Sequence, residues 1–261
     1  MARGRHIWTN GFFVWVAIFL VLPILISASV SITTDEFIAF PPKGVSLRWY
    51  GELITNPSWR HSIGNTLAVG SLCAVLSTII GTMVAYGVSH IENRLLRDGL
   101  LILFLAPLAM PQMSIGMAMY PLFAKLGLIG TRWGVSIAQG VLALPFVVLS
   151  IIATIRQRDR ALERAARTLG ASPMKAFWFV ALPLMLPGVA AGAILAFMTS
   201  FDDVIMPIFL GGFDANTLPK VMLEALYEKS DPSVMAASTG FSVVGIVMFL
   251  ALSVLVRRRN A

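Results

Sequence analysis

The residues able to do chemistry are few and widely spaced in this chain. Two adjacent carboxylates, Asp202 and Asp203, lie within the otherwise apolar stretch TSFDDVIMP. The three histidines, His6, His61 and His90, lie near the ends of apolar runs and do not cluster with acidic residues. No nucleophile stands beside a general base, and no Gly-x-x-x-x-Gly-Lys-Ser/Thr stretch that would cradle nucleotide phosphates is present. We therefore predict no catalytic residue, metal site or cofactor in this chain.

The acidic pair has two interpretations. A carboxylate in the middle of a membrane span costs about 2.5–3.5 kcal/mol, so such groups usually face a bundle interior or a water-filled cavity. Counted from Leu184, the pair lies about 27 Å along a helix that rises 1.5 Å per residue, near one end of a ~30 Å hydrocarbon core. The pair could form an anionic ring or gate on the path of a cationic solute. Alternatively, it lies at the interface, touches water and caps the next segment.

The composition that surrounds these residues is typical of a polytopic membrane protein. Of the 261 residues, 57% are hydrophobic and only 13% are charged, whereas soluble domains carry about 25% charged residues. Six apolar segments are long enough to cross a ~30 Å hydrocarbon core. They are Gly11–Ser31, Asn65–Ser89, Leu100–Leu126, Trp133–Ile155, Leu184–Leu210 and Ser233–Val256. We predict an all-α integral membrane protein with six transmembrane helices in a single domain over residues 1–261, with a kink in the third span at Pro107 and Pro111.

The positions of Lys and Arg predict the orientation. Most of them fall before the first span, between spans two and three, between spans four and five, and after span six. The positive-inside rule places these segments, and both termini, in the cytoplasm. The loops at residues 32–64 and 211–232 are then outside. Within the second, Leu218, Met222, Ala225 and Leu226 have near-helical spacing, which predicts a short amphipathic helix.

The loop at residues 156–183, between spans four and five, has strong helix signals. Asp159 can cap a helix whose apolar face is formed by Leu162, Ala165, Ala166 and Leu169, and Glu163 and Arg167 are spaced for an i,i+4 ion pair. Gly170 fits the left-handed position after a helix, and Ser172 followed by Pro173 fits the start of a second one. A surface helix with this small-residue face suits either a groove on a partner or the headgroup region of a membrane.

The stretch ERAARTLGASPMKAFWFVALPLMLPG resembles the conserved cytoplasmic loop of permease subunits of binding-protein-dependent ABC importers. That pattern reads Glu-Ala-Ala, three residues, Gly, nine residues, an aliphatic residue, one residue and Leu-Pro. Ala165, Ala166, Gly170 and Leu182–Pro183 match it. Arg164 stands where the family usually has Glu, and Glu163 lies one position earlier, about 100° around the helix.

The resemblance implies that the loop holds a coupling helix that docks into a cleft of a separate ATP-hydrolysing subunit. Its implied contact residues are Glu163, Arg164, Ala165, Ala166, Leu169, Gly170, Ser172 and Pro173. ATP and Mg²⁺ are then bound by two ATPase subunits and not by this chain. The other implied partners are a second permease, forming a heterodimer, and a periplasmic solute-binding protein. The charged docking contact is expected to use Glu163 or a reversed charge.

The phrases SFDDVIMPIFLGG, LPKVMLEAL and DPSVMAASTG look like the end of permeases in the spermidine/putrescine branch of this superfamily. This resemblance implies a translocation path past Phe201, Asp202 and Asp203 for a polyamine or similar small cation. The same machinery for another solute (amino-acid-like, phosphonate or metal ion) stays open. A self-sufficient secondary transporter would need coupling charges deep in several spans, and only the acidic pair is present.

Overall fold

The computed structural model describes residues 2–156, 161–228 and 232–260, and the side chains of 12–156, 161–228 and 232–253. All regular elements within these residues are helices. The chain divides into two compact units, Met1–Arg60 with Val221–Ile246 and His61–Lys220 with Val247–Ala261. Asp159, the expected cap of the helix in the loop between spans four and five, lies outside the described residues.

The first unit contains α1 (Ala2–Val30) and α2 (Arg48–Thr55), together with parts of α11 (Leu218–Glu228) and α12 (Ser233–Asn260). The segment after α1 is held by Trp49, whose indole N–H donates to the carbonyl of Thr33 at 3.0 Å. The hydroxyls of Ser31 and Tyr50 lie 2.8 Å apart. These contacts fix α2 against the end of α1, and they involve buried groups that hydropathy alone does not reveal.

The loop expected at residues 32–64 is therefore only partly a loop. Its second half is helical, because α2 spans Arg48–Thr55 and α3 (Pro57–Ser89) begins eight residues before the predicted second span. The start of α3 has a local cause. The side-chain oxygen of Asn56 accepts a hydrogen bond from the N–H of Ser58 at 2.9 Å, and proline suits the first position of a helix. The amphipathic helix expected from Leu218 onward is present as α11.

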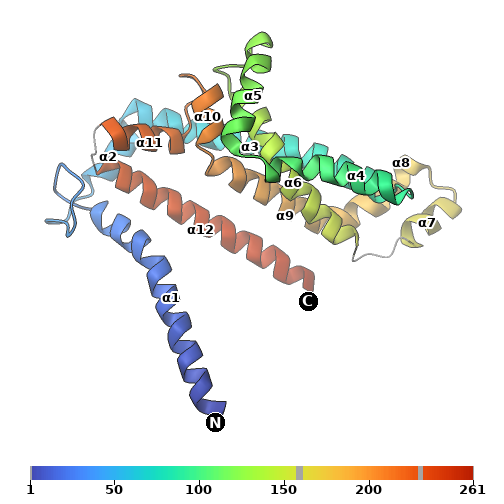
Figure 1. Cartoon of the computed structure of the whole chain (residues 1–261), viewed down its shortest axis with the longest axis horizontal. Coiled ribbons are helices and arrows are strands. Elements are labelled where there is room, and N and C mark those ends of the chain that lie inside the picture. Colours follow the sequence, from blue (N-terminus) through green and yellow to red (C-terminus); the bar gives the residue numbers. More distant parts are fainter. Residues whose placement is uncertain (1, 157–160, 229–231, 261) are drawn as a thin grey trace. The chain divides into compact units, whose positions relative to one another are not determined.

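The second unit is built around α6 (Arg132–Ile155), which packs along α9 (Leu182–Phe201) (Figure 1). Val147, Val148 and Ile151 of α6 are fully buried. Two glycines one turn apart on α9, Gly188 and Gly192, allow this close approach. A Cβ atom on Gly192 would lie 3.1 Å from the Cα of Val147. Small residues at such contacts are the usual means by which membrane helices pack closely.

The third predicted span is two helices instead of one kinked helix. α4 (Arg94–Leu105) continues into the 3₁₀ turn η1 (Ala106–Ala109), and α5 (Gln112–Lys125) then departs at 104°. Pro111 stands at this break and cannot donate a backbone hydrogen bond. Within the described chain, five helices are long and apolar enough to cross a membrane, and the bent pair is the sixth candidate.

The fifth predicted span also differs from a single helix over Leu184–Leu210. It begins earlier, because α8 (Pro173–Ala176) and the π-helical turn η2 (Phe177–Ala181) run directly into α9. Pro183 has no N–H to donate to the preceding turn, which is a common setting for such local irregularity. The helix then stops at Phe201, and a separate helix, α10 (Ile205–Leu210), follows. The acidic pair lies at this break.

Candidate functional sites

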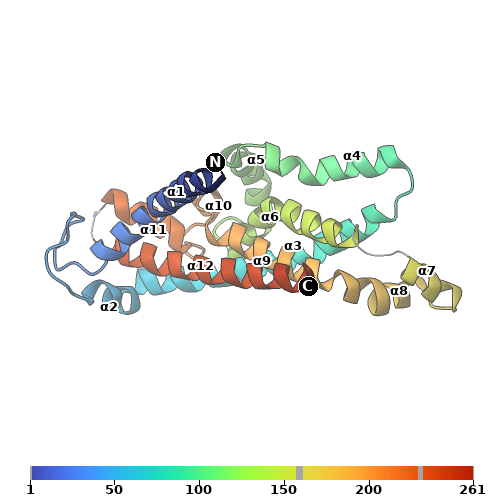
Figure 2. The same ribbon diagram turned by 90° about the horizontal axis from the view of Figure 1, so that it is seen from below.

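In the loop between α6 and α9, the predicted first helix, glycine turn and serine cap are present. α7 (Ala161–Thr168) is followed by Gly170 with φ +90°, a conformation that L side chains rarely adopt. The hydroxyl of Ser172 then accepts from the N–H of Lys175 at 3.3 Å and caps α8. α7 and α8 lie together at one end of the second unit (Figures 1 and 2). The glycine turn and the capped helix thus connect α7 to α9 by a short, ordered path.

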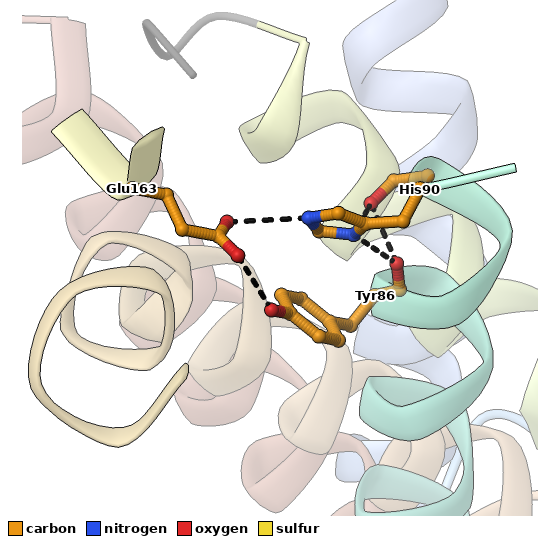
Figure 3. A network of polar contacts seen from close by, with 4 residues as sticks. Tyr86, His90 and Glu163 are labelled. Carbon is orange, nitrogen blue, oxygen red and sulfur yellow. Dashed lines mark hydrogen bonds and ion pairs between the residues drawn. The ribbon is translucent and has the colours of Figure 1, made fainter. Parts of the chain in front are cut away.

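Glu163 is turned toward the end of α3. The hydroxyl of Tyr86 donates to Oε1 of Glu163 at 2.7 Å, and Nε2 of His90 lies 3.3 Å from Oε2 (Figure 3). The glutamate side chain is only 15% exposed. The expectation that the histidines stand apart from acidic residues is therefore wrong for His90. The expected pair between Glu163 and Arg167 is also absent from the ion pairs of the described residues.

The aromatic ring of Tyr86 is itself held by neighbours. Its centroid lies 4.3 Å from that of His90 and 4.8 Å from that of Phe177, which meets it edge-on. Nδ1 of His90 lies 2.9 Å from the carbonyl oxygen of Tyr86. These contacts join α3, α7 and η2 around one carboxylate. Neither Tyr86 nor His90 was predicted as part of the site, because each is more than 70 residues from Glu163 in the sequence.

Apart from Glu163 and Ala166, the residues of α7 are exposed. Leu162 and Leu169 are 54% and 88% exposed, Arg164 and Ala165 are exposed, and Ala166 is half-buried. Beside the helix lies a groove of about 780 Å³, whose lining includes Tyr86, Arg164, Met174 and Phe177. Among the described residues, the predicted apolar face is therefore exposed at both of its leucines, Leu169 more than Leu162. A short helix that exposes such a face is suited to packing into a groove of another protein.

The second candidate site is the break between α9 and α10, where the two aspartates differ. Asp203 is 6% exposed, and its carboxylate accepts hydrogen bonds from the N–H groups of Ile205 and Met206 at 3.1 and 3.2 Å. The side-chain amide of Gln139 donates to it at 2.9 Å, and Ser200 donates to the carbonyl oxygen of the same amide. Asp203 thus caps α10, as the second interpretation of the pair expected, but it is buried and does not have the water contact that this interpretation also expected.

Asp202 has the opposite environment. Its side chain is exposed, and its backbone N–H closes the last turn of α9 by donating to the carbonyl oxygen of Met198. Phe201, the third residue expected along a translocation path, is 7% exposed and stacks on Phe197 with ring centroids 5.8 Å apart. Of the three residues, only Asp202 presents its side chain to the surroundings of this chain. Gln139 was missed by sequence reasoning, although a glutamine within an apolar span is itself a signal of a buried polar contact.

Comparison with known proteins gives a family match over residues 77–260, to the binding-protein-dependent transport system inner membrane component. The chain is 30% identical over 243 residues to the putrescine transport system permease protein PotI of Escherichia coli strain K12, covering 89% of this chain and 85% of PotI. It is 27% identical over 257 residues to the spermidine/putrescine transport system permease protein PotC of Haemophilus influenzae, covering 98% and 99%.

The fold is shared with a solved transporter. A chain of the bacterial alginate ABC transporter, in complex with an alginate-pentasaccharide-bound periplasmic protein, matches with a TM-score of 0.75. The match covers 97% of this chain and 93% of that one, at 14% sequence identity. At that identity the likeness concerns the fold alone.

Proposed function

The chain belongs to the family of inner membrane components of binding-protein-dependent transport systems and is a permease subunit of an ABC importer, and we propose that α7 couples it to an ATPase subunit. The observation that supports this proposal is that Leu162 of α7 and Leu169, directly after it, are exposed, while the helix is joined to α9 by the Gly170 turn and the Ser172 cap. A push on α7 is then transmitted to α9. This assigns residues 156–183 as the coupling loop.

The proposed assembly follows from this role. The permease lies in the inner membrane with both termini in the cytoplasm, since most basic residues fall in the two terminal segments and in the loops after the second and fourth predicted spans. It pairs with a second permease to form the solute path, and each permease docks one ATPase subunit. ATP and Mg²⁺ bind to those subunits, so this chain does no hydrolysis itself. A periplasmic binding protein, like the one in the alginate transporter complex, delivers the solute.

The proposed solute is a polyamine such as putrescine or spermidine. PotI and PotC match most of the chain, and their names include putrescine and spermidine. The exposed carboxylate of Asp202 fits a polycation, because opposite charge along a path raises the local concentration of the solute. Fold alone does not fix a solute, as the shared fold of an alginate transporter illustrates. A different small cation or zwitterion is the alternative.

The coupling role is tested with Ala165→Arg in proteoliposomes that hold the full importer. A long charged side chain on the exposed face of α7 is expected to lower ATP-driven uptake by about tenfold or more, as truncating or blocking a central interface residue typically costs 2 kcal/mol or more. Ala39→Arg is the matched control, since Ala39 is exposed in the segment before α2. Normal uptake and normal ATPase binding by the Ala165→Arg permease would refute the coupling role.

The solute is tested separately with the cognate binding protein. Calorimetry against putrescine, spermidine and small zwitterionic compounds is expected to give the tightest binding for a polyamine. Tight binding of an anion, with no binding of a polyamine, would contradict the assignment. Because this measurement uses the binding protein without the permease, its result does not depend on the coupling role of α7.

A further inference from the structure

Glu163 and Arg164 are neighbours on α7 but have different surroundings. Both carboxylate oxygens of Glu163 are occupied inside this chain, one by the hydroxyl of Tyr86 and the other by the ring of His90 (Figure 3). The side chain of Glu163 is 15% exposed. A carboxylate used in this way is directed away from any partner that approaches α7 from outside. Glu163 is also the only acidic residue within α7.

The geometry of the helix then decides which charge a partner meets. Successive residues of an α-helix point about 100° apart, so residues 163 and 166 lie about 60° from each other. These two are the least exposed positions of α7. On the opposite side lie Arg164, Ala165 and Thr168, and all three are exposed. Arg164 thus belongs to the outward face, and the charge on that face is positive.

The inward contact is rigid enough to fix this orientation. Tyr86 packs against both His90 and Phe177, with ring centroids 4.3 and 4.8 Å apart. A rotation of α7 that brought Glu163 outward would break the bond to Tyr86 and leave the charge of Arg164 facing the aromatic cluster. Hydrogen bonds to a charged group are among the stronger ones in proteins.

We propose that Glu163 is a positioning residue that anchors α7 to the end of α3, and that Arg164 is the charged contact with the ATPase subunit, whose cleft presents an acidic side chain at this point. The proposal rests on the coupling role of α7 and adds the chemistry of its partner. Arg164 is exposed and is the charged residue of the outward face formed with Ala165 and Thr168, so that face of α7 is basic. An acidic cleft lip is complementary to that face, and such pairs govern specificity and association rate.

The test measures binding of the ATPase subunit to the complete membrane complex, held in nanodiscs, at low and high salt. Wild-type binding is expected to weaken with rising salt. Arg164→Glu is expected to weaken binding at low salt by about tenfold or more, because like charges then face each other. Arg164→Lys keeps the charge and is expected to stay within about threefold of wild type. Glu163→Gln keeps an acceptor for Tyr86 and is expected to leave the salt dependence unchanged.

Three outcomes would overturn the proposal. The first is normal binding by Arg164→Glu. The second is loss of the salt dependence in Glu163→Gln, which would show that this carboxylate faces the partner. The third is an equal effect of Lys175→Glu, a charge reversal on exposed α8 that would indicate general attraction to a basic surface. Ala165→Arg distinguishes failure of the charged contact from failure of the coupling role. If Ala165→Arg blocks binding of the ATPase subunit while Arg164→Glu does not, α7 docks but Arg164 is not the charged contact. Normal binding by both variants refutes docking of α7 itself.

Discussion

The side chains of two adjacent pairs of residues have the same arrangement. The pairs are Glu163–Arg164 in the loop and Asp202–Asp203 at the end of α9. In each pair one side chain turns into the protein and the other is exposed. Glu163 turns inward to meet the side chains of Tyr86 and His90. Asp203 turns inward chiefly to meet backbone N–H groups of its own chain segment.

The difference lies in what each inward carboxylate stabilises. Asp203 satisfies the start of α10, a task that Asp performs at many helix N-termini, and it also accepts from Gln139 of the buried helix α6. Glu163 joins α7 to a helix more than 70 residues away. Losing Asp203 should therefore damage the folded unit itself, whereas losing Glu163 should free one surface helix. In both pairs the exposed neighbour is the residue available to a partner or a solute.

The largest expected effect is that of Asp203→Ala. It leaves the N–H groups of Ile205 and Met206 without their acceptor, and the amide of Gln139 keeps only the longer bond to the carbonyl oxygen of Ser200. Because each buried donor left unsatisfied costs about 1–3 kcal/mol, we expect the free energy of unfolding to fall by about 3 kcal/mol. Denaturant titration in mixed micelles measures this change.

Asp203→Asn is the matched variant. It keeps one acceptor oxygen and a good capping side chain, so a loss of about 1 kcal/mol is expected. If Asp203→Ala unfolds like wild type, the cap is not what holds α10, and the contrast with Glu163 disappears.

An intermediate effect is expected for Glu163→Ala, which removes the acceptor of Tyr86 and the partner of His90. Hydrogen bonds to charged groups contribute about 1.5–3 kcal/mol, and partial exposure favours the lower end. Amide exchange over residues 161–168 should then become about tenfold faster, while the core helices α6 and α9 keep their protection.

Arg164→Ala is the control for that measurement, since it alters the same helix without touching the anchor. Its exchange rates over residues 161–168 are expected to stay within about twofold of wild type, as surface substitutions usually change stability by less than ±0.5 kcal/mol. Equal acceleration in both variants would mean that α7 is held by general packing, and Glu163 would lose its separate role.

The sequence predicts the local features of the loop well. The Gly170 turn and the Ser172 cap are encoded in short stretches, and the structure has both. The long apolar helices α3, α6, α9 and α12 likewise follow from hydropathy. The contacts of Glu163 could not be predicted, because pairing with Tyr86 and His90 depends on how distant helices pack.

The break between α9 and α10 had a visible but weak signal. Two acidic residues barely lower the mean hydropathy of a 27-residue segment, so the segment was predicted as one span. Asp is nevertheless one of the residues preferred at the start of a helix. The cap could have been expected at Asp203, whereas its second partner, Gln139 on α6, could be identified only from the fold.

The smallest expected effect on stability is that of Asp202→Asn. This variant tests most sharply whether Asp202 and Asp203 have different roles. Asp202 is exposed, and among the described residues its carboxylate is bonded to its own backbone N–H and to no other residue's side chain. The free energy of unfolding should therefore change by less than about 0.5 kcal/mol. If the exposed carboxylate attracts a cationic solute, putrescine uptake at low concentration should still fall about fivefold, because a charge pair about 4 Å apart contributes about 1 kcal/mol even in water.

Asp202→Glu keeps the charge and should retain most of the uptake. Comparing it with Asp202→Asn distinguishes an effect of the lost charge from an effect of the changed side-chain shape. ATPase activity measured in the same proteoliposomes shows whether coupling is intact. Unchanged uptake by Asp202→Asn, together with normal stability, would mean that the exposed carboxylate only ends α9 and touches water. The acidic pair would then contain one cap and one surface residue, and the electrostatic attraction of the solute would have to come from the second permease.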